Sequence, residues 1–148
     1  AHPLVFVAPP GHVLLHGGPH AASALAPYPI ISREHGSGTR TAMERFFAEQ
    51  HFDTRIAMEM SSNETIKQAV MAGLGVSFLS LHTMGLELRS GLLRLLDIRG
   101  APVMRVWNVV NLSAKLLSPA AEAFRYFMLE QGEAHLLAHD TPLLSPKG

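Results

Sequence analysis

Residues 33–40, REHGSGTR, bring together the residue types that proteins use to bind anions. The segment follows the apolar run YPIIS and precedes TAMERFF, which has the pattern of a helix. A loop between a strand and a helix exposes unpaired backbone N–H groups at the positive end of the helix dipole. The hydroxyls of Ser37 and Thr39 and the guanidinium of Arg40 would add donors and charge. The pattern predicts an anion site made of Ser37, Gly38, Thr39 and Arg40.

The same loop also has a purely structural interpretation. Ser37 or Thr39 could cap the helix, and Arg40 could pair with Glu44 four residues later. Three other motifs do not fit. A Walker A loop needs a lysine after the second glycine, the dinucleotide fingerprint needs a third glycine, and a nucleophile elbow needs glycine where His35 stands. Anion binding and helix capping both remain open for this loop.

A second polar helix start, SSNET, follows the run RIAMEM, whose alternation of apolar and polar residues is typical of a strand. The carboxyl ends of parallel strands lie at one edge of a sheet, where open α/β folds bind their ligands. Ser61 and Glu64 have the spacing of a capping box, which leaves Ser62 and Asn63 free. We therefore expect Ser62 and Asn63 to be available to the same anion site.

The nine histidines do not predict a metal site. His12, His16 and His20 are spaced by four residues, which on a helix would align three imidazoles. The residues between the last two, GGP, make a continuous helix improbable, so we expect no bound metal. His82 opens a predicted helix, and we interpret it as a capping or solvated residue rather than a catalytic base.

The composition excludes several classes of protein. The 148 residues are enough for one domain with a buried core, and 47% of them are hydrophobic. Twelve Lys and Arg balance twelve Asp and Glu, whereas nucleic-acid-binding domains normally carry a basic excess. The absence of cysteine excludes disulfides and thiolate chemistry. No apolar run approaches the roughly 20 residues of a membrane span and no signal sequence is apparent, which favours a cytoplasmic protein.

Apolar periodicity predicts strands that alternate with helices. The first strand, 3–8, is followed by a loop over 11–29 with at most a short helical turn. Further strands are expected at 28–32, 55–60, 75–81 and 92–98, and helices at 39–50, 61–73 and 82–91. This order is typical of an α/β fold whose parallel strands are joined by right-handed crossovers.

One long strand and one helix are expected in the last third of the chain. Residues 103–112 form a strand long enough to bridge two lobes, with Met104, Val106, Val110 and Leu112 on one face. Trp107 lies on the other face, where we expect it to pack against a second lobe or a partner chain.

The helix that follows has Ser118 as its N-cap and Pro119 at its first position. We expect it to end near Gly132 and to be followed by a loosely ordered tail. The side chains predicted to point inward are Ala120, Phe124, Phe127 and Met128.

Three runs of the sequence resemble the effector-binding domain of LysR-type transcriptional regulators. They are REHGSGTRTAMERFF, MEMSSNETIKQAVMAGLGVSFLSLHTMGLELRSGLLRLLDI and VWNVVNLSAKLLSPAAEAFRYFM. The block SSNETIKQAV is similar in particular to regulators of Calvin-cycle (RuBisCO) operons.

This resemblance implies an α/β, periplasmic-binding-protein-like (type 2) fold, with two lobes joined by two crossover strands. Residues 1–27 would form a crossover strand and linker from the first lobe, and 28–100 the second lobe. Residues 101–132 would form the return strand and the carboxyl-terminal helix of the first lobe, followed by a tail at 133–148. Most of the first lobe and the winged helix-turn-helix have no counterpart in this sequence, and we expect the chain to be part of a longer protein.

The resemblance also implies a function. Residues 37–40 and 61–63 would face a cleft between the lobes and bind a small anionic metabolite. A phosphorylated sugar or a nucleotide, such as ribulose bisphosphate or NADPH, is the expected ligand. Binding would shift the lobes between two arrangements, which the DNA-binding domains of a homodimer or tetramer would detect. No catalysis, cofactor or membrane association is implied.

Two other interpretations remain. A periplasmic solute-binding protein for an anion would share the two-lobe fold and would have an export signal upstream. A hydrolase would use Ser37 with one of the histidines, although the missing elbow glycine weighs against it.

Overall fold

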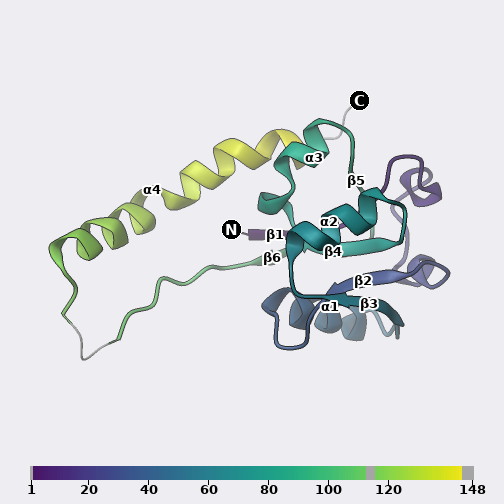
Figure 1. Ribbon diagram of the computed structural model, residues 1–148, viewed down its shortest axis with the longest axis horizontal. Coiled ribbons are helices and arrows are strands. Elements are labelled where there is room, and N and C mark those ends of the chain that lie inside the picture. The colour runs from purple at the N-terminus through teal and green to yellow at the C-terminus, as the bar shows by residue number, and fades with distance from the viewer. Residues whose placement is uncertain (1, 113–115, 145–148) are drawn as a thin grey trace.

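The computed structural model describes residues 2–112 and 116–144 (Figure 1). Within these residues six strands form one mixed sheet in the order β3-β2-β4-β1-β5, with β6 also beside β1. The strands are β1 (His2–Ala8), β2 (Ile30–Arg33), β3 (Ile56–Met60), β4 (Val76–Ser80), β5 (Arg94–Leu95) and β6 (Val103–Arg105). The described helices are α1 (Gly38–Glu49), α2 (Asn63–Met71), α3 (Gly85–Arg89) and α4 (Pro119–Leu144), with the 3-10 helices η1 (Val13–Leu15), η2 (Ala22–Leu25) and η3 (Leu81–Thr83). None of the described helices is long and apolar enough to cross a membrane.

The direction of β1 corrects the expectation of a parallel sheet. β2 is parallel to both β3 and β4, but β1 is antiparallel to β4, β5 and β6. Among the described strands β1 therefore runs against all the others. The alternation of strands and helices predicts the relative direction only of strands that a helix connects. Residues 9–29, which link β1 to β2, contain only the 3-10 helices η1 and η2, so no crossover helix sets the direction of β1.

The helices α1 and α2 cover opposite faces of the sheet, because alternate residues of β1 point to opposite faces. Phe6 packs with Phe46 of α1 in one buried cluster. Val7 packs with Val70 of α2 in the other. All seven residues of β1 are buried, as expected for a strand covered on both sides.

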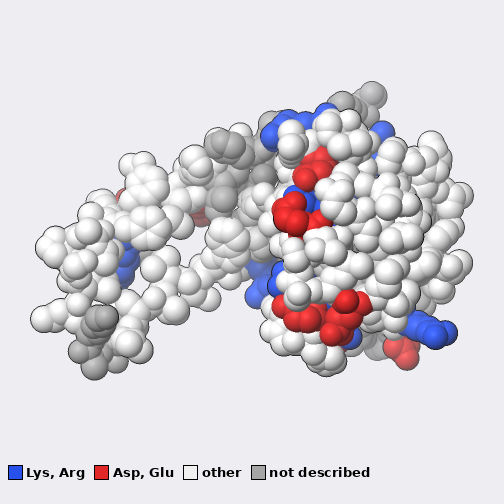
Figure 2. Space-filling model, in the orientation of Figure 1, with Lys and Arg blue, Asp and Glu red and all other residues white. Residues whose placement is uncertain are grey.

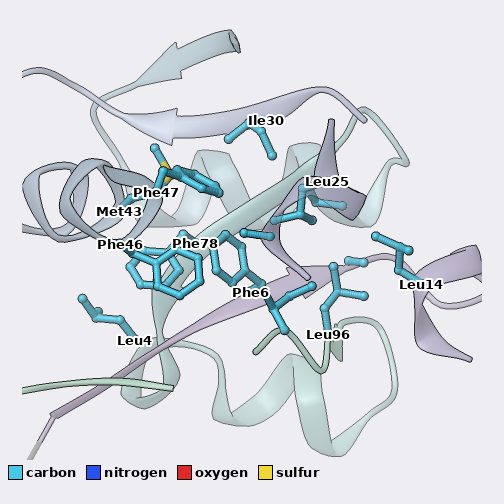
Figure 3. Close-up of a cluster of buried hydrophobic side chains, with 14 residues drawn as sticks. Leu4, Phe6, Leu14, Leu25, Ile30, Met43, Phe46, Phe47, Phe78 and Leu96 are labelled. Atoms are coloured by element: carbon cyan, nitrogen blue, oxygen red, sulfur yellow. The ribbon is translucent and has the colours of Figure 1, made fainter. Parts of the chain in front are cut away.

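An aromatic cluster holds α1 against the centre of the sheet. Figure 3 shows Phe6 and Phe78 of the sheet beside Phe46 and Phe47 of α1. The ring centroids of Phe6 and Phe78 are 4.7 Å apart, and those of Phe6 and Phe46 are 5.3 Å apart. Buried aromatic pairs at such distances contribute about 0.5–1.5 kcal/mol beyond their burial. The cluster fixes where the first turn of α1 lies relative to the strand ends.

The prediction of one long strand over 103–112 is wrong beyond Arg105. Only Val103–Arg105 forms a strand, and it pairs with β1, with Arg105 opposite His2. Residues 106–112 then lead away from the sheet (Figure 1). Val106, Val110 and Leu112 are exposed along this segment. The apolar face expected there has no covering partner among the described residues.

The final helix also differs from expectation. It begins at Pro119, and the Oγ of Ser118 accepts a hydrogen bond from the N–H of Ala121, as predicted for an N-cap. It continues past Gly132 to Leu144, since one glycine in a helix costs only about 1 kcal/mol. The predicted loose tail is therefore helical over its described part. Ala120, Phe124 and Phe127 are exposed rather than inward.

Candidate functional site

The parallel pairing of β2 and β3 brings the two polar helix starts to one edge of the sheet. Arg33, the last residue of β2, is paired with Met60, the last residue of β3. The N–H of Glu34 also donates to the carbonyl of Met60 at 3.1 Å. From this edge the chain enters α1 on one face and α2 on the other, so the openings of the two helices lie on either side of the edge. Their shared edge was expected from the sequence; their role in binding remains a prediction.

The opening of α1 combines a cap with free backbone donors. The Oγ of Ser37 accepts a hydrogen bond from the N–H of Thr39 at 3.3 Å, which confirms the capping interpretation for this serine. Ser37 also accepts from Thr41 through its carbonyl. No acceptor within the described residues bonds the N–H groups of Gly38 or Arg40. Gly38 is exposed, so its amide remains available to a ligand.

Arg40 lies beneath this opening and is already paired. Its Nε donates to Glu44 at 2.6 Å, and its Nη1 donates to Glu59 at 3.3 Å and to the carbonyl of Arg33 at 3.2 Å. The side chain is only 10% exposed. The predicted ion pair of Arg40 with Glu44 is therefore formed. Through its bonds to Arg33 and Glu59, Arg40 also connects α1 to β2 and β3. An anion at Arg40 would compete with two carboxylates.

The opening of α2 differs from the predicted capping box. The N-cap is Ser62, whose Oγ accepts from the N–H of Thr65, and Ser61 is exposed before it. The helix begins one residue later than the spacing of Ser61 and Glu64 implied, and Glu64 pairs with Lys67 instead. Ser62 is therefore occupied as a cap rather than free.

Arg33 bridges the two openings. Its Nη1 donates to the Oδ1 of Asn63 at 2.8 Å, so Asn63 is not free either. Its Nε and Nη2 donate to the carboxylate of Glu34 at 2.8 and 3.0 Å. This pairing raises the pKa of Arg33 and lowers that of Glu34. Figure 2 shows acidic and basic side chains interspersed on this side of the molecule rather than one basic surface.

Sequence reasoning missed Arg105, which contributes a further cation to the α1 opening. A Cβ atom built on Gly38 would lie 2.9 Å from the Nη1 of Arg105, so the guanidinium rests against this glycine. β6 brings Arg105 there by pairing with β1. The sequence placed Arg105 on a strand but gave no sign of that strand's neighbours. Only the register of β6 on β1 reveals the contact.

His2, His82 and Trp107 form a ring cluster next to Arg105. The ring centroid of His2 lies 4.4 Å from that of Trp107 and 5.0 Å from that of His82. Burial, followed by the nearby His82 and Arg105, lowers the pKa of His2 to about 4, so its imidazole is neutral at pH 7. His82 packs in this cluster and is not the solvated or capping residue that we expected. Trp107 contacts both histidines and remains half-exposed.

The described residues contain no group of three or more His, Cys, Asp or Glu placed to hold a metal ion. Of the three evenly spaced histidines, His12 and His16 flank η1, and His20 forms an isolated β-bridge with Ile98. The Nδ1 of His12 accepts from the N–H of Leu14, and the Nε2 of His20 lies 2.9 Å from the carbonyl oxygen of His16.

A cavity of about 450 Å³ lies away from the carboxyl edge, along α1 and the segment that leads into β3. Its walls combine apolar residues, among them Met43, Phe47 and Phe52, with polar ones such as Arg40 and Glu44. Of the residues predicted for the anion site, Arg40 lines this cavity, whereas Ser37, Gly38, Thr39 and residues 61–63 do not. We therefore place the candidate site at the strand ends and not in this cavity, because there the Gly38 amide and the Arg105 guanidinium lie together without an acceptor or carboxylate from the described residues.

The profile of the LysR substrate binding domain matches residues 1–133, and the chain belongs to this family. Its fold is mixed α/β, and its structural neighbours are type 2 periplasmic-binding-protein-like regulatory domains. The chain is 49% identical over 130 residues to the transcriptional regulator CfxR of Cupriavidus necator, covering 88% of this chain and 41% of that protein. It is 48% identical over 130 residues to the RuBisCO operon transcriptional regulator of Allochromatium vinosum, covering 88% and 43%.

Solved structures agree with this assignment. The regulatory domain of Synechocystis CcmR, determined in complex with 2-PG, is 37% identical with a TM-score of 0.76, covering 94% of this chain and 63% of that chain. The effector binding domain of QuiR, in complex with shikimate, shares the fold at 22% identity and a TM-score of 0.71, covering 90% and 63%. The chain spans less than half the length of the two curated relatives. Those relatives are named as transcriptional regulators, not as enzymes.

Proposed function

We propose that this chain is the effector-sensing part of a LysR-type regulator of carbon-fixation genes. It binds a small anionic metabolite at the carboxyl edge of the sheet, where α1 and α2 begin. The observation that carries the proposal is the opening of α1, where the amides of Gly38 and Arg40 have no acceptor among the described residues and the guanidinium of Arg105 rests against Gly38. Backbone amides at a helix start and a guanidinium together favour negative charge.

The ligand is a phosphorylated sugar or a nucleotide, such as ribulose bisphosphate or NADPH. Two features support this class. The site offers hydrogen-bond donors and positive charge, and the CcmR regulatory domain, 37% identical, has been solved with 2-PG. The residues that contribute directly are Gly38, Thr39 and the exposed Ser61. Ser37, Arg40, Ser62 and Asn63 hold the openings in place through the bonds described above and can also reach the ligand if those bonds rearrange.

In the full-length protein, which is cytoplasmic, this chain supplies the second lobe (28–100), one crossover strand (1–27), and the return strand with the final helix (101–132). The remaining lobe closes the other side of the cleft. Effector binding shifts the population between two lobe arrangements, and a winged helix-turn-helix in the same polypeptide responds through a dimer or tetramer. A ligand changes this equilibrium only by its difference in affinity for the two arrangements.

Isothermal titration calorimetry of the full-length protein tests the proposal. Ribulose bisphosphate, NADPH and 2-PG are the ligands, and ribulose is the matched uncharged control. We expect at least one phosphorylated ligand to bind and ribulose to give no heat. The absence of binding by every phosphorylated ligand, or equal binding of ribulose, would contradict the proposal. Unchanged binding in Arg40→Ala would limit Arg40 to its structural role.

The relatives also favour this function over the two alternatives. A periplasmic solute-binding protein would share the fold, but the chain is 49% identical over 130 residues to a protein named as a transcriptional regulator. A hydrolase would need Ser37 as nucleophile, yet its hydroxyl caps α1 by accepting from Thr39.

A further inference from the structure

Arg105 places a guanidinium at the opening of α1, and no carboxylate of the described residues neutralises it. A Cβ atom on Gly38 would lie 2.9 Å from Nη1 and 3.0 Å from Nη2 of Arg105. Among the described residues no carboxylate lies within ion-pair distance of Arg105, whereas Arg33 and Arg40 are both paired. The positive end of α1 and this guanidinium repel each other unless an anion lies between them.

Two buried polar atoms close to this contact have no hydrogen-bond partner among the described residues. They are the Nδ1 of His2 and the Oγ of Ser80, in residues that are 7% and 5% exposed. His2 is paired with Arg105, and Ser80 lies opposite Leu4. Leu4 and Phe78 belong to the cluster under α1. His2 is two residues before Leu4 and Ser80 is two residues after Phe78, so both side chains point to the same face as that cluster. Both side chains are therefore directed toward the α1 side of the edge where Arg105 lies.

These groups share one chemical property, since each can donate a hydrogen bond. The guanidinium and the amide of Gly38 donate only, the hydroxyl of Ser80 can donate, and neutral His2 donates from Nδ1 in one of its tautomers. Buried polar atoms in proteins are almost always hydrogen-bonded, so the orphaned pair indicates a missing acceptor. A phosphoryl group presents three acceptor oxygens and close to two negative charges, and it matches the fork of an arginine.

We propose that Arg105, the amide of Gly38 and the side chains of Ser80 and His2 form the subsite that takes a phosphoryl group of the effector. The inference rests on the proposed function, because it specifies which part of that site receives the negative charge. It assigns the charge-binding role to Arg105, on β6, rather than to Arg40. A phosphoryl group bound there contacts both α1 and β6, and β6 leads into the segment that connects the two lobes. Binding therefore acts directly on that connecting segment.

Calorimetric titration of the full-length protein with 2-PG and with inorganic phosphate, at matched ionic strength, tests the subsite. We expect Arg105→Gln to weaken the binding of both ligands by about 10- to 100-fold, which is the range for losing charge-assisted hydrogen bonds. Arg94→Gln is the matched control, because Arg94 is an exposed arginine on β5, the other strand paired with this side of β1. We expect Arg94→Gln to change affinity by less than twofold.

A second variant perturbs the subsite without removing a charge. Gly38→Ala puts a methyl group where the guanidinium of Arg105 now lies, and the backbone of Gly38 lies outside the left-handed region, so alanine is tolerated there. Alanine is also the better helix former, so the thermal midpoint should not fall. We expect phosphate affinity to drop several-fold while stability is kept. A lower phosphate affinity with an unchanged thermal midpoint would show that the substitution affects binding and not the fold.

The outcomes distinguish this inference from the proposed function. If wild-type protein binds 2-PG or another phosphorylated metabolite and Arg105→Gln binds it equally well, the subsite is wrong and the sensing function stands. If no metabolite binds but inorganic phosphate binds in an Arg105-dependent way, the subsite stands and the effector class is wrong. If the wild-type protein binds neither phosphate nor any phosphorylated metabolite, both are overturned.

Discussion

At the scale of single residues, the three arginines at the carboxyl edge differ in their partners and hence in what they can do. Arg33 is held by Glu34 and Asn63, and Arg40 by two carboxylates and a carbonyl. Arg105 has no carboxylate among the described residues. The sequence singled out Arg40 because it ends a recognisable loop. It could not single out Arg105, because the pairing state of an arginine depends on residues that only the fold brings together.

Arg40→Gln should destabilise the protein, because it removes a buried guanidinium that connects α1 to β2 and β3. We expect the free energy of unfolding to fall by about 1–3 kcal/mol in urea denaturation. Arg45→Gln on the same helix is the control. The pair of Arg45 and Glu49 is exposed on both sides, and such pairs contribute about 0–1 kcal/mol. Equal effects of the two substitutions would show that Arg40 does not anchor the α1 opening.

His2 should make stability depend on pH in the mildly acidic range. Its pKa falls from 6.5 in the unfolded chain to about 4 in the folded protein, chiefly through burial. Between these values the unfolded state binds more protons, so stability decreases as pH drops from 6.5 to 4 and is fully retained above 6.5. The loss approaches about 3 kcal/mol below pH 4.

Urea unfolding of His2→Gln across this range checks that expectation. The substitution should flatten the dependence of the unfolding free energy on pH. His12→Gln is the comparison, because burial also lowers the pKa of His12, and the two substitutions should act in the same direction. A His2→Gln profile that runs parallel to the wild-type profile would contradict a neutral, buried His2.

At the scale of elements, the α2 and α3 helices are joined by one buried lysine. The Nζ of Lys67 donates to Glu87 at 2.8 Å and to the carbonyl of Thr83 at 3.0 Å, and it pairs with Glu64 at 2.7 Å. The side chains of Lys67 and Glu87 are 6% and 13% exposed. No local sequence pattern indicates this link, since Lys67 and Glu87 are 20 residues apart.

Lys67→Met should destabilise the protein by about 3–5 kcal/mol, because it leaves Glu87 buried and unpaired. The double variant Lys67→Met/Glu87→Leu should lose less than the sum of the single variants, since it removes both charges. Chemical denaturation of the four proteins of this cycle measures the coupling. Additive losses would mean that the pair does not hold α2 against α3.

The elements that could be predicted from the sequence are those that local patterns determine. The apolar faces of α1 and α2 and the three strands β2, β3 and β4 follow from periodicity, as does the shared edge of the two helix openings. The direction of β1, the short reach of β6 and the length of α4 could not be predicted. Each depends on which segment pairs or packs with it, and no local pattern contains that information.

At the scale of the whole molecule, residues 106–112 and α4 carry apolar side chains that no described residue covers. Val106, Val110 and Leu112 are exposed after β6, and Phe124 and Phe127 are exposed on α4. The curated relatives are more than twice as long as the aligned region. We expect the additional lobe of the full-length protein to cover these residues, so that an anion bound beside Arg105 lies near the boundary between lobes.

The most direct test of the central claim is the position of a bound anion in crystals of the full-length protein. Tungstate resembles phosphate in shape and charge, and its tungsten atom scatters anomalously. The account predicts an anomalous peak within hydrogen-bond reach of the Gly38 amide and the Arg105 guanidinium, and no such peak in Arg105→Gln. A peak at a different surface, or one that persists at this opening in Arg105→Gln, would contradict it.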